Sequence, residues 1–360
     1  EEIGRRSIGS TMNLSYVITN HVMEGCSSSD EYNCSEMYTF DPLFTDSDNG
    51  DYSLLSASPA IDAGNPDSDG DGVTWVSDVD DQDPDGSQMD MGAYYFAQES
   101  GPTDVSGVIS SNTNWRAASS PYIATGNVLV SEAVTLTIEP GVEVKFDSDK
   151  SLQINGELIA QGTSSNKITF TSNLSSPAAG DWGGIVFEDE SIDAIVSNDL
   201  EYISGSIIKS CIVEYAGPGI TINHSHPFIE GNIIQFNKQN SGDNVAGGIR
   251  LYFAIGDNLI IRKNIIKNNH AESNSGIAGG IRIIKGQNIR IYNNIFISNS
   301  AHIYNPNYAY GSSGIHLDNP TGPYYINNNT FSNNSITGIE GSNYNSRIAS
   351  AVFAEGTTTY

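Results

Sequence analysis

A pattern that returns every 30 to 35 residues restricts the fold of this 360-residue chain more than any other feature. The tetrapeptide Gly247–Arg250 recurs as Gly279–Arg282, and a looser copy begins at Gly314. Each copy is followed by an alternating apolar stretch, a polar turn and a second short strand that ends in asparagine. The second strands read GNIIQFN, KNIIKNN, NNIFISN and NNTFSNN, and they place asparagine at positions 232, 264, 294 and 329. Such self-similarity indicates a solenoid of stacked repeats.

The content of one repeat favours a coil of short β-strands. Isoleucine, valine and phenylalanine alternate with polar residues, as in strands that bury one face. Asparagine and glycine are expected at the corners, because both tolerate a left-handed backbone and asparagine can hydrogen-bond locally. A leucine-rich repeat is disfavoured because its leucine framework is missing, and a β-propeller would need longer four-stranded units. We therefore expect an all-β parallel β-helix that rises roughly 4.8 Å per coil.

The solenoid is expected to begin within residues 109–170. The stretch NVLVSEAVTLTIEPGVEVKF alternates strongly, turns at Glu139–Gly141 and continues in SLQINGELIAQGT and NKITFTS. The run Asp181–Ile185, which reads DWGGI, then opens the regular coils. An amphipathic first layer would cover a sheet end that is otherwise prone to aggregation.

These motifs carry a resemblance to a known family. LTIEPGVEVKF, the DWGGI run and the N-x-I repeats resemble the N-terminal halves of secreted bacterial right-handed parallel β-helix repeat proteins of the pectate-lyase-like superfamily. Residues 42–96, with PLFTDSDNGDYSLLSASPAIDAGNPD and DMGAYYF, resemble the closing segment of that family. The resemblance implies the fold and a secreted, extracellular or cell-surface protein. It implies almost nothing about activity.

The order of these segments suggests three parts. Residues 1–97 are expected to be the C-terminal closing segment of a preceding β-helix, 98–108 a linker, and 109–360 a β-helix with an N-terminal capping layer but no closure of its own. Two interpretations stay open. The chain is a fragment of a larger protein with several solenoids, or it is one period of a head-to-tail array in which residues 1–97 complete the preceding copy.

Charge is distributed unevenly along the chain. The net charge is −27, so nucleic acids and anionic membranes are poor partners, and no apolar run is long enough to span a membrane. Lysine and arginine are absent between Arg6 and Arg116, whereas 14 aspartates fall between Asp41 and Asp90. Uniform surface acidity would not cluster in this way. The pattern indicates a segment that binds cations.

The aspartates of this segment have the spacing of a calcium loop. With Asp67 as position 1, acidic residues stand at positions 1, 3, 5 and 12, and Gly72 at position 6 permits the sharp turn. The loop resembles those of dockerins and thrombospondin type 3 repeats, but flanking amphipathic helices are absent, so a sensor EF-hand is disfavoured. The expected Ca²⁺ ligands of this first set are Asp67, Asp69, Asp71, Asp78 and the carbonyl of Val73. A second, incomplete set comprises Asp81, Asp83, Asp85 and Asp90. We expect calcium to lock the junction between two solenoids.

The coils give little support to catalysis. A polysaccharide lyase would need a basic residue near calcium-binding acids, yet no acidic cluster accompanies the basic residues of the coils. Arg250 and Arg282 share a coil position and are expected to be solvated outward side chains. A polygalacturonase-like hydrolase would need paired aspartates on adjacent strands, and these are not found. His224 and His226 are expected on one strand face, but no third metal ligand is evident.

The cysteines and tyrosines complete the expectations. Cys26 and Cys34 flank a polar loop and could form a disulfide, while Cys211 is expected to be a buried, small apolar residue. The favoured function is a non-catalytic structural or adhesive segment of a surface, matrix or fibre protein, in which copies could assemble head to tail. The alternative is a module that binds or cleaves surface polysaccharide, with outward tyrosines such as those of Tyr304–Gly311 stacking on sugars. If the chain were an enzyme, it would be a lyase or a glycoside hydrolase.

Overall fold

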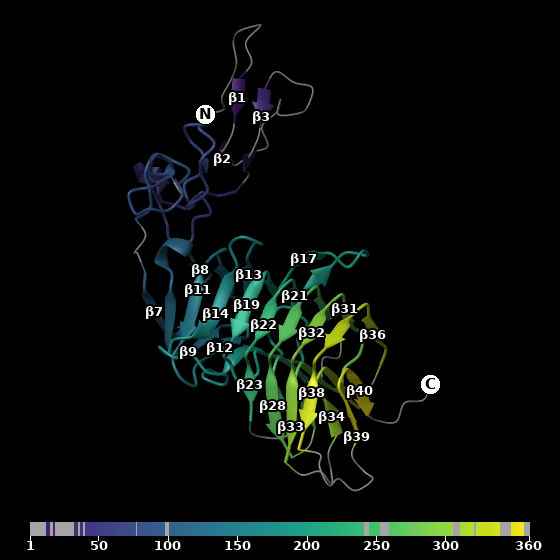
Figure 1. Ribbon diagram of the computed structural model, residues 1–360. Helices are drawn as coiled ribbons and strands as arrows, with labels where there is room; N and C mark the ends of the chain where they lie inside the picture. The colour runs from purple at the N-terminus through teal and green to yellow at the C-terminus, as the bar shows by residue number, and fades with distance from the viewer. Residues whose placement is uncertain are drawn as a thin grey trace. The chain divides into compact units, whose positions relative to one another are not determined.

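The computed structural model describes residues 40–355 apart from 77, 98–100, 241–244, 253–258, 275, 305–309, 320–321 and 339–346, together with the backbone of four short strands before residue 40 (Figure 1). The chain divides into two compact units, Glu1–Ser100 and Gly101–Tyr360. Regular structure in the described residues consists of β-strands and short 3₁₀ helices. No helix among them is both long and apolar enough to cross a membrane.

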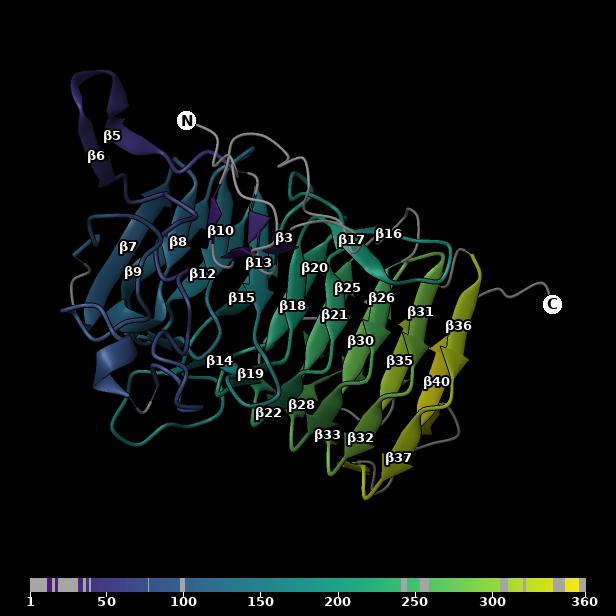
Figure 2. The ribbon, with the colours of Figure 1, turned by 90° about the horizontal axis from the view of Figure 1, so that it is seen from above.

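The second unit is a right-handed parallel β-helix, as predicted. Its strands stack in successive coils, which are clearest in the view from above (Figure 2). The eight-stranded sheet has the order β36 (Tyr324–Asn327), β31 (Ile289–Tyr292), β26 (Ile260–Arg262), β21 (Phe228–Glu230), β18 (Ile207–Lys209), β13 (Glu157–Gln161), β10 (Thr135–Ile138) and β8 (Thr113–Trp115).

A sixteen-stranded sheet forms two further faces of the solenoid. Its order is β37 (Thr330–Ser332), β32 (Ile295–Ile297), β27 (Ile265–Lys267), β22 (Ile233–Gln235), β19 (Cys211–Glu214), β14 (Ile168–Ser172), β11 (Glu143–Phe146), β9 (Tyr122–Val130), β12 (Ser151–Ile154), β15 (Gly184–Phe187), β20 (Ile220–Asn223), β25 (Ile249–Tyr252), β30 (Ile281–Ile284), β35 (Ile315–Asp318) and β40 (Val352–Glu355). The remaining strand, β7 (Thr103–Ile109), pairs with β9.

Strand β9 joins these two faces into one sheet. Its first half, Tyr122–Ala124, pairs with β11, and its second half, Val128–Val130, pairs with β12. Strand β7 pairs in parallel with both halves of β9 and has no other partner strand in the described part of the sheet. The expected linker at 98–108 therefore differs from the structure, because the solenoid already begins at Thr103. The strand is mostly exposed and has little hydrophobic alternation, so its composition resembles a linker.

Alternation along the strands builds the core. In β10, β11 and β12, alternate residues are buried and half-buried, and the buried set joins one continuous hydrophobic cluster. Trp182 stacks on Phe146 with ring centroids 4.0 Å apart, and its Nε1 donates a hydrogen bond to the carbonyl of Glu214. Cys211 is fully buried, as predicted. The predicted Cys26–Cys34 disulfide lies outside the residues whose side chains the structure describes.

Two asparagine ladders, buried except at the last asparagine of each, connect successive coils. In each ladder, the side-chain oxygen of one asparagine accepts hydrogen bonds from the backbone and side-chain amides of the asparagine one coil earlier. The first ladder comprises Asn232, Asn264, Asn294 and Asn329, and the second comprises Asn237, Asn269, Asn299 and Asn334. The left-handed backbone that was expected at the corners does occur there, but the ladder asparagines themselves do not adopt it. The preceding residues do: Gly231, Lys263, Asn293 and Asn328.

The C-terminal coils are enlarged by two short four-stranded sheets. One has the order β23 (Lys238–Gln239), β28 (His270–Ser273), β33 (Ser300–Ile303) and β38 (Ser335–Thr337). The other has the order β24 (Val245–Ala246), β29 (Ile277–Ala278), β34 (Tyr310–Ser312) and β39 (Arg347–Ala349). A separate small apolar cluster that includes Ala271 and Ile303 lies between these sheets.

An inserted hairpin interrupts the regular coils. Its strands are β16 (Ile195–Val196) and β17 (Tyr202–Ser204), which pair antiparallel. Ala194, Val196 and Tyr202 pack with Phe228 of β21 and Ile260 of β26, so the hairpin covers apolar residues on the outside of the eight-stranded sheet.

The first unit contains short strands and long loops. Before residue 40, β1 (Met12–Leu14) pairs in parallel with β3 (Tyr32–Cys34), and β2 (Val17–Ile18) pairs in parallel with β4 (Met37–Tyr38). An antiparallel hairpin follows, with β5 (Phe44–Asp46), the 3₁₀ helix η1 (Ser47–Asn49) and β6 (Asp51–Leu54). A small apolar cluster that includes Leu54, Ile61 and Met91 forms the core of this part of the unit.

Candidate functional site

Three predicted calcium ligands converge in the first acidic loop. Asp67, Asp69 and Asp71 each present a carboxylate oxygen, and these oxygens lie within 4.8 Å of one another. Asp69 and Asp71 are exposed, and Asp67 is half-buried. Carboxylate oxygens at this separation can hold one hard cation. The structure therefore brings together the predicted ligands at loop positions 1, 3 and 5.

Backbone hydrogen bonds shape this loop. Oδ1 of Asp67 accepts from the amide of Gly70 at 2.8 Å, and Oδ2 accepts from the amide of Gly72 at 3.1 Å. Both glycines have positive φ, 79° and 88°, so the chain turns sharply enough to wrap around the Asp67 carboxylate. The amide of Asp71 bonds to Oδ1 of Asp69 and lowers its pKa. A limited loss of hydration, together with the charges of Asp71, Asp81 and Asp78, outweighs this bond, and the pKa of Asp69 is raised.

Asp78 is not part of this converging group, and the carbonyl of Val73 stays a prediction. Asp78 precedes the 3₁₀ helix η2 (Val79–Asp81), and its Oδ1 accepts a capping bond from the amide of Asp80 at 3.0 Å. Val73 is exposed, and its amide donates to Oδ1 of Asp71. Asp81, predicted in the second set, instead contacts the first loop, because Ser68 donates both its amide and its hydroxyl to Asp81 Oδ1 at 2.6 Å.

The rest of the second set forms a hydrogen-bonded framework. Asp90 accepts from the amides of Asp62 and Phe96 on its two carboxylate oxygens, at 2.7 and 2.5 Å. Asp83 Oδ2 accepts from the amide of Asp90, and Asp85 Oδ1 accepts from the amide and hydroxyl of Ser87. Burial, together with the charges of Asp90, Asp85 and Asp62, raises the pKa of Asp83 to about 6. These acids tie the two ends of the segment together, and they do not converge as the first three do.

The coil arginines are not all solvated. The expectation for Arg282 was wrong, since its side chain is completely buried. Its Nη2 donates to Asp318 Oδ2 at 2.8 Å, and its Nη1 contacts Nδ1 of His316. Arg250 is half-buried, with its guanidinium 5.3 Å from the ring centre of Tyr252. A charged side chain that points out of the sheet is buried here because the next coil supplies its acidic partner.

The two histidines do not form a strand-face pair. Strand β20 ends at Asn223, His224 is exposed with φ of 55°, and His226 is buried. Asp193 Oδ1 accepts a hydrogen bond from the backbone amide of His226 at 2.7 Å, and Asp193 Oδ2 lies 3.0 Å from Nδ1 of the same histidine. The pair attaches the base of the β16–β17 insertion to the next coil.

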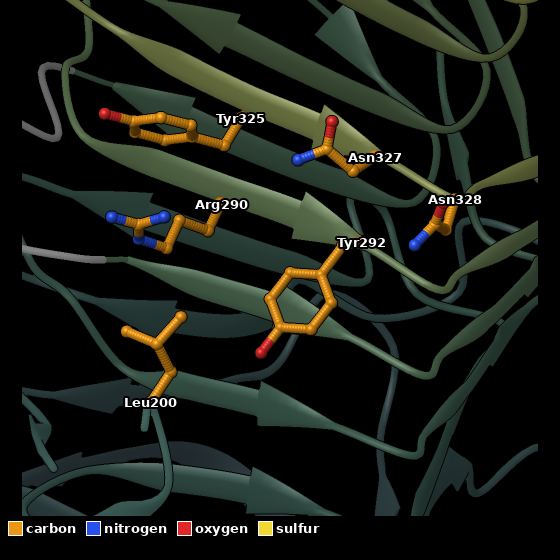
Figure 3. Close-up of a pocket in the computed structure, with 6 residues that line it drawn as sticks. All are labelled: Leu200, Arg290, Tyr292, Tyr325, Asn327 and Asn328. Carbon is orange, nitrogen blue, oxygen red and sulfur yellow. The ribbon is translucent and has the colours of Figure 1, made fainter. Parts of the chain in front are cut away.

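A shallow hollow lies on the outer face of the eight-stranded sheet, beside the inserted hairpin (Figure 3). Its volume is about 230 Å³, and its lining residues are Leu200, Arg290, Tyr292, Tyr325, Asn327 and Asn328. The guanidinium of Arg290 lies 4.2 Å from the ring centre of Tyr325, on the neighbouring coil. Aromatic rings, amides and a guanidinium are groups that contact sugars in proteins.

Sequence reasoning missed a polar cluster on the added sheet of β23 and β28. Glu272 accepts from Tyr304 at 2.6 Å, contacts His270 at 2.8 Å and pairs with Lys238 at 3.0 Å. The Tyr304 bond, with the His270 and Lys238 contacts, lowers the pKa of Glu272 to about 2. Tyr304 thus begins the tyrosine-rich insertion by bonding to the solenoid, while 305–309 lie outside the described residues.

Comparisons with known proteins support the fold. Residues 107–192 match the family model described as "Pectate-lyase like beta helix domain". A stretch of 66 residues is 42% identical to Protein bark beetle of Drosophila melanogaster. This stretch makes up 18% of this chain and 2% of the fly protein. The chain thus matches only a small part of that relative's length. No solved structure matches the chain. The family match supports the pectate-lyase-like superfamily for the first coils.

Proposed function

We propose that this chain is an extracellular structural or adhesive β-helix segment of a surface, matrix or fibre protein, and that calcium bound by the Asp67–Asp71 loop stabilises it. The observation that carries the proposal is the convergence of Asp67, Asp69 and Asp71. Like charges at this separation repel each other, and a divalent cation converts that repulsion into attraction. A rigid solenoid with repeated outward faces suits spacing and multivalent contact.

The donor chemistry favours calcium over other metals. The converging group contains only carboxylates, without the histidine or cysteine that zinc and copper sites use. Backbone amides hold the Asp67 carboxylate in a tight loop, as expected for a site that accommodates a large cation with many oxygen ligands. Magnesium would demand stricter octahedral geometry and retain more of its water.

The test is a thermal melt of the full chain with calcium, with magnesium and with chelator. At a calcium concentration 100 times Kd, binding to the folded state adds about 2.7 kcal/mol. In a unit as small as the first one, this shifts its melting transition by on the order of 10 °C. Asp67→Asn and Asp71→Asn together should abolish the shift, whereas Asp41→Asn should leave it intact. If chelator leaves the melting temperature of the wild-type chain unchanged, the calcium proposal is overturned.

Head-to-tail assembly is the second part of the structural proposal. The segment that resembles a closing unit precedes the solenoid in the chain, and strands β36 to β40 form sheet edges in the described structure. Exposed parallel edges can pair with another chain. Native mass measurement across a concentration series should show species larger than one chain. A single monomeric mass at all concentrations would contradict assembly.

Polysaccharide binding is the alternative, and the hollow beside Tyr325 is the observation that favours it. Tyr325→Ala together with Arg290→Ala should remove binding on a glycan array if the hollow holds sugar, whereas the exposed Tyr52→Ala should not. Product analysis of every bound glycan separates binding from cleavage. Products with unsaturated ends would show that the chain is a lyase, and the structural proposal would then be abandoned.

A further inference from the structure

Asp81 is fully buried, although it carries a carboxylate and lies in a strongly acidic loop region. Its Oδ1 accepts two short hydrogen bonds from Ser68. Its Oδ2 is also buried, and the structure gives that atom no hydrogen-bond partner. A buried polar atom without a donor is costly, and such an atom in a folded protein calls for a specific partner. For a carboxylate oxygen, that partner is a hydrogen-bond donor or a cation.

The position of this oxygen identifies the kind of partner. Ser68, which holds Oδ1, lies in sequence between two of the converging acids, Asp67 and Asp69. Because Ser68 is the neighbour of both acids in the chain, Asp81 lies beside the loop that carries the converging carboxylates. A cation would satisfy the orphan oxygen and the repulsion together.

We infer that Asp81 Oδ2 is a direct ligand of the cation held by Asp67, Asp69 and Asp71. The inference rests on the proposed function and deepens it. Asp81 takes the place that the sequence spacing assigned to Asp78, whose carboxylate instead caps η2. The site would then comprise three carboxylates from the loop and one from a buried 3₁₀ helix residue, a set of hard oxygen ligands suited to Ca²⁺ or a lanthanide ion.

Trp75 makes the inference directly measurable. It lies between the loop and η2, its amide donates to the carbonyl of Pro66 at 2.8 Å, and Gln82 Nε2 donates to its carbonyl. Terbium substitutes for calcium at oxygen sites, and a nearby tryptophan sensitises its emission. Titrating the full chain with Tb³⁺ reports affinity, and emission lifetimes in H₂O and D₂O count the water molecules on the ion. Trp75→Phe should remove the sensitised signal and thereby locate it.

Asp81→Asn should weaken terbium binding by at least tenfold and add one water molecule to the bound ion. Asp78→Asn should change affinity by less than threefold and leave the hydration unchanged. Ser68→Ala removes the hydroxyl that orients Asp81 but keeps the carboxylate, so the hydration number should again stay constant. This third variant separates ligation from loop support, because only loss of a ligand adds water.

The outcomes separate the inference from the function on which it rests. If the wild-type chain binds no terbium near Trp75, the calcium proposal itself fails. If it binds and Asp81→Asn leaves affinity and hydration unchanged, Asp81 is not a ligand, although the calcium site stands. Asp81 is likewise excluded as a ligand if Asp78→Asn is the variant that adds water, or if Asp81→Asn and Ser68→Ala behave alike. A melt without cation checks folding: Asp81→Asn should still give a cooperative transition, because the amide oxygen of asparagine can accept the two Ser68 bonds.

Discussion

Asn264 Oδ1 accepts two hydrogen bonds from Asn232, one from its backbone amide at 2.9 Å and one from its side-chain amide at 3.0 Å. Asn264 in turn donates to Asn294 Oδ1 and to the carbonyl of Ile229. Each ladder asparagine thus satisfies buried backbone groups that strand pairing leaves open at the corner, and its position is repeated in four successive coils.

Replacing Asn264 should destabilise the solenoid. Asn264→Ala leaves two donors of Asn232 and the Ile229 carbonyl without partners in a dry interior, at a cost of about 3 kcal/mol or more. Urea unfolding measures the loss. Asn327→Ala, at an exposed position of the same solenoid, should cost less than about 0.5 kcal/mol. Equal effects of the two substitutions would contradict the role given to the ladder.

Arg262 is expected to hold the inserted hairpin onto the sheet. Its buried guanidinium pairs with Glu230, donates to Glu201 Oε2 at 2.6 Å and donates to the Leu200 carbonyl at 3.0 Å. Arg262→Met leaves Glu230 buried without this partner, which should cost about 3–5 kcal/mol. Hydrogen exchange at 195–204 should accelerate as the hairpin detaches. Lys263→Met is the matched control, because Lys263 meets the same Glu230 from an exposed position at 3.5 Å and should contribute less than about 1 kcal/mol.

His316 should make the solenoid sensitive to mild acid. Burial, aided by the Arg282 charge, lowers its pKa to about 3 from the ordinary value of 6.5. Between these values the unfolded chain binds a proton that the folded chain does not, so stability falls as pH falls below 6.5. From pH 6.5 to 5 the loss is about 2 kcal/mol. His316→Gln should remove that part of the pH dependence in urea midpoints. Glu272, with its pKa lowered to about 2, stabilises the fold above pH 4.5, and this stabilisation is lost as the pH falls from about 4.5 towards 2.

Gly72 should control cation affinity through backbone conformation alone. Its φ is +88°, and a Cβ placed there would meet no atom within 4 Å, so Gly72→Ala adds strain without a clash. That strain, on the order of 1 kcal/mol, acts on the turn that holds Asp67. Calcium affinity by calorimetry should fall about fivefold to tenfold. Gly86→Ala imposes the same strain at φ +88° in the second acidic set. If calcium occupies only the first loop, this control should leave affinity unchanged.

The repeat pattern was sufficient to predict the fold class, since alternation and corner residues are local properties of each coil. It also located the asparagines of the first ladder, although it attributed them to backbone conformation. Their true partners lie one coil away, and a single repeat carries no sign of that contact. The strand β7 escaped prediction for a related reason: its pairing with β9 is defined by the neighbouring strand, and its own residues are largely exposed.

For the candidate site, the sequence by itself determined which acids could converge, because positions 1, 3 and 5 of a tight loop place Asp67, Asp69 and Asp71 together. Only the tertiary structure decided which later acid contacts the loop that carries them. Spacing favoured Asp78, yet the turn of η2 directs Asp78 to its own helix cap and buries Asp81 against Ser68. Tertiary structure likewise decided that Arg282 is buried, because Asp318 and His316 reach it from the next coil. Local spacing determines what one turn can do, whereas burial depends on residues that are neighbours only after the chain has coiled.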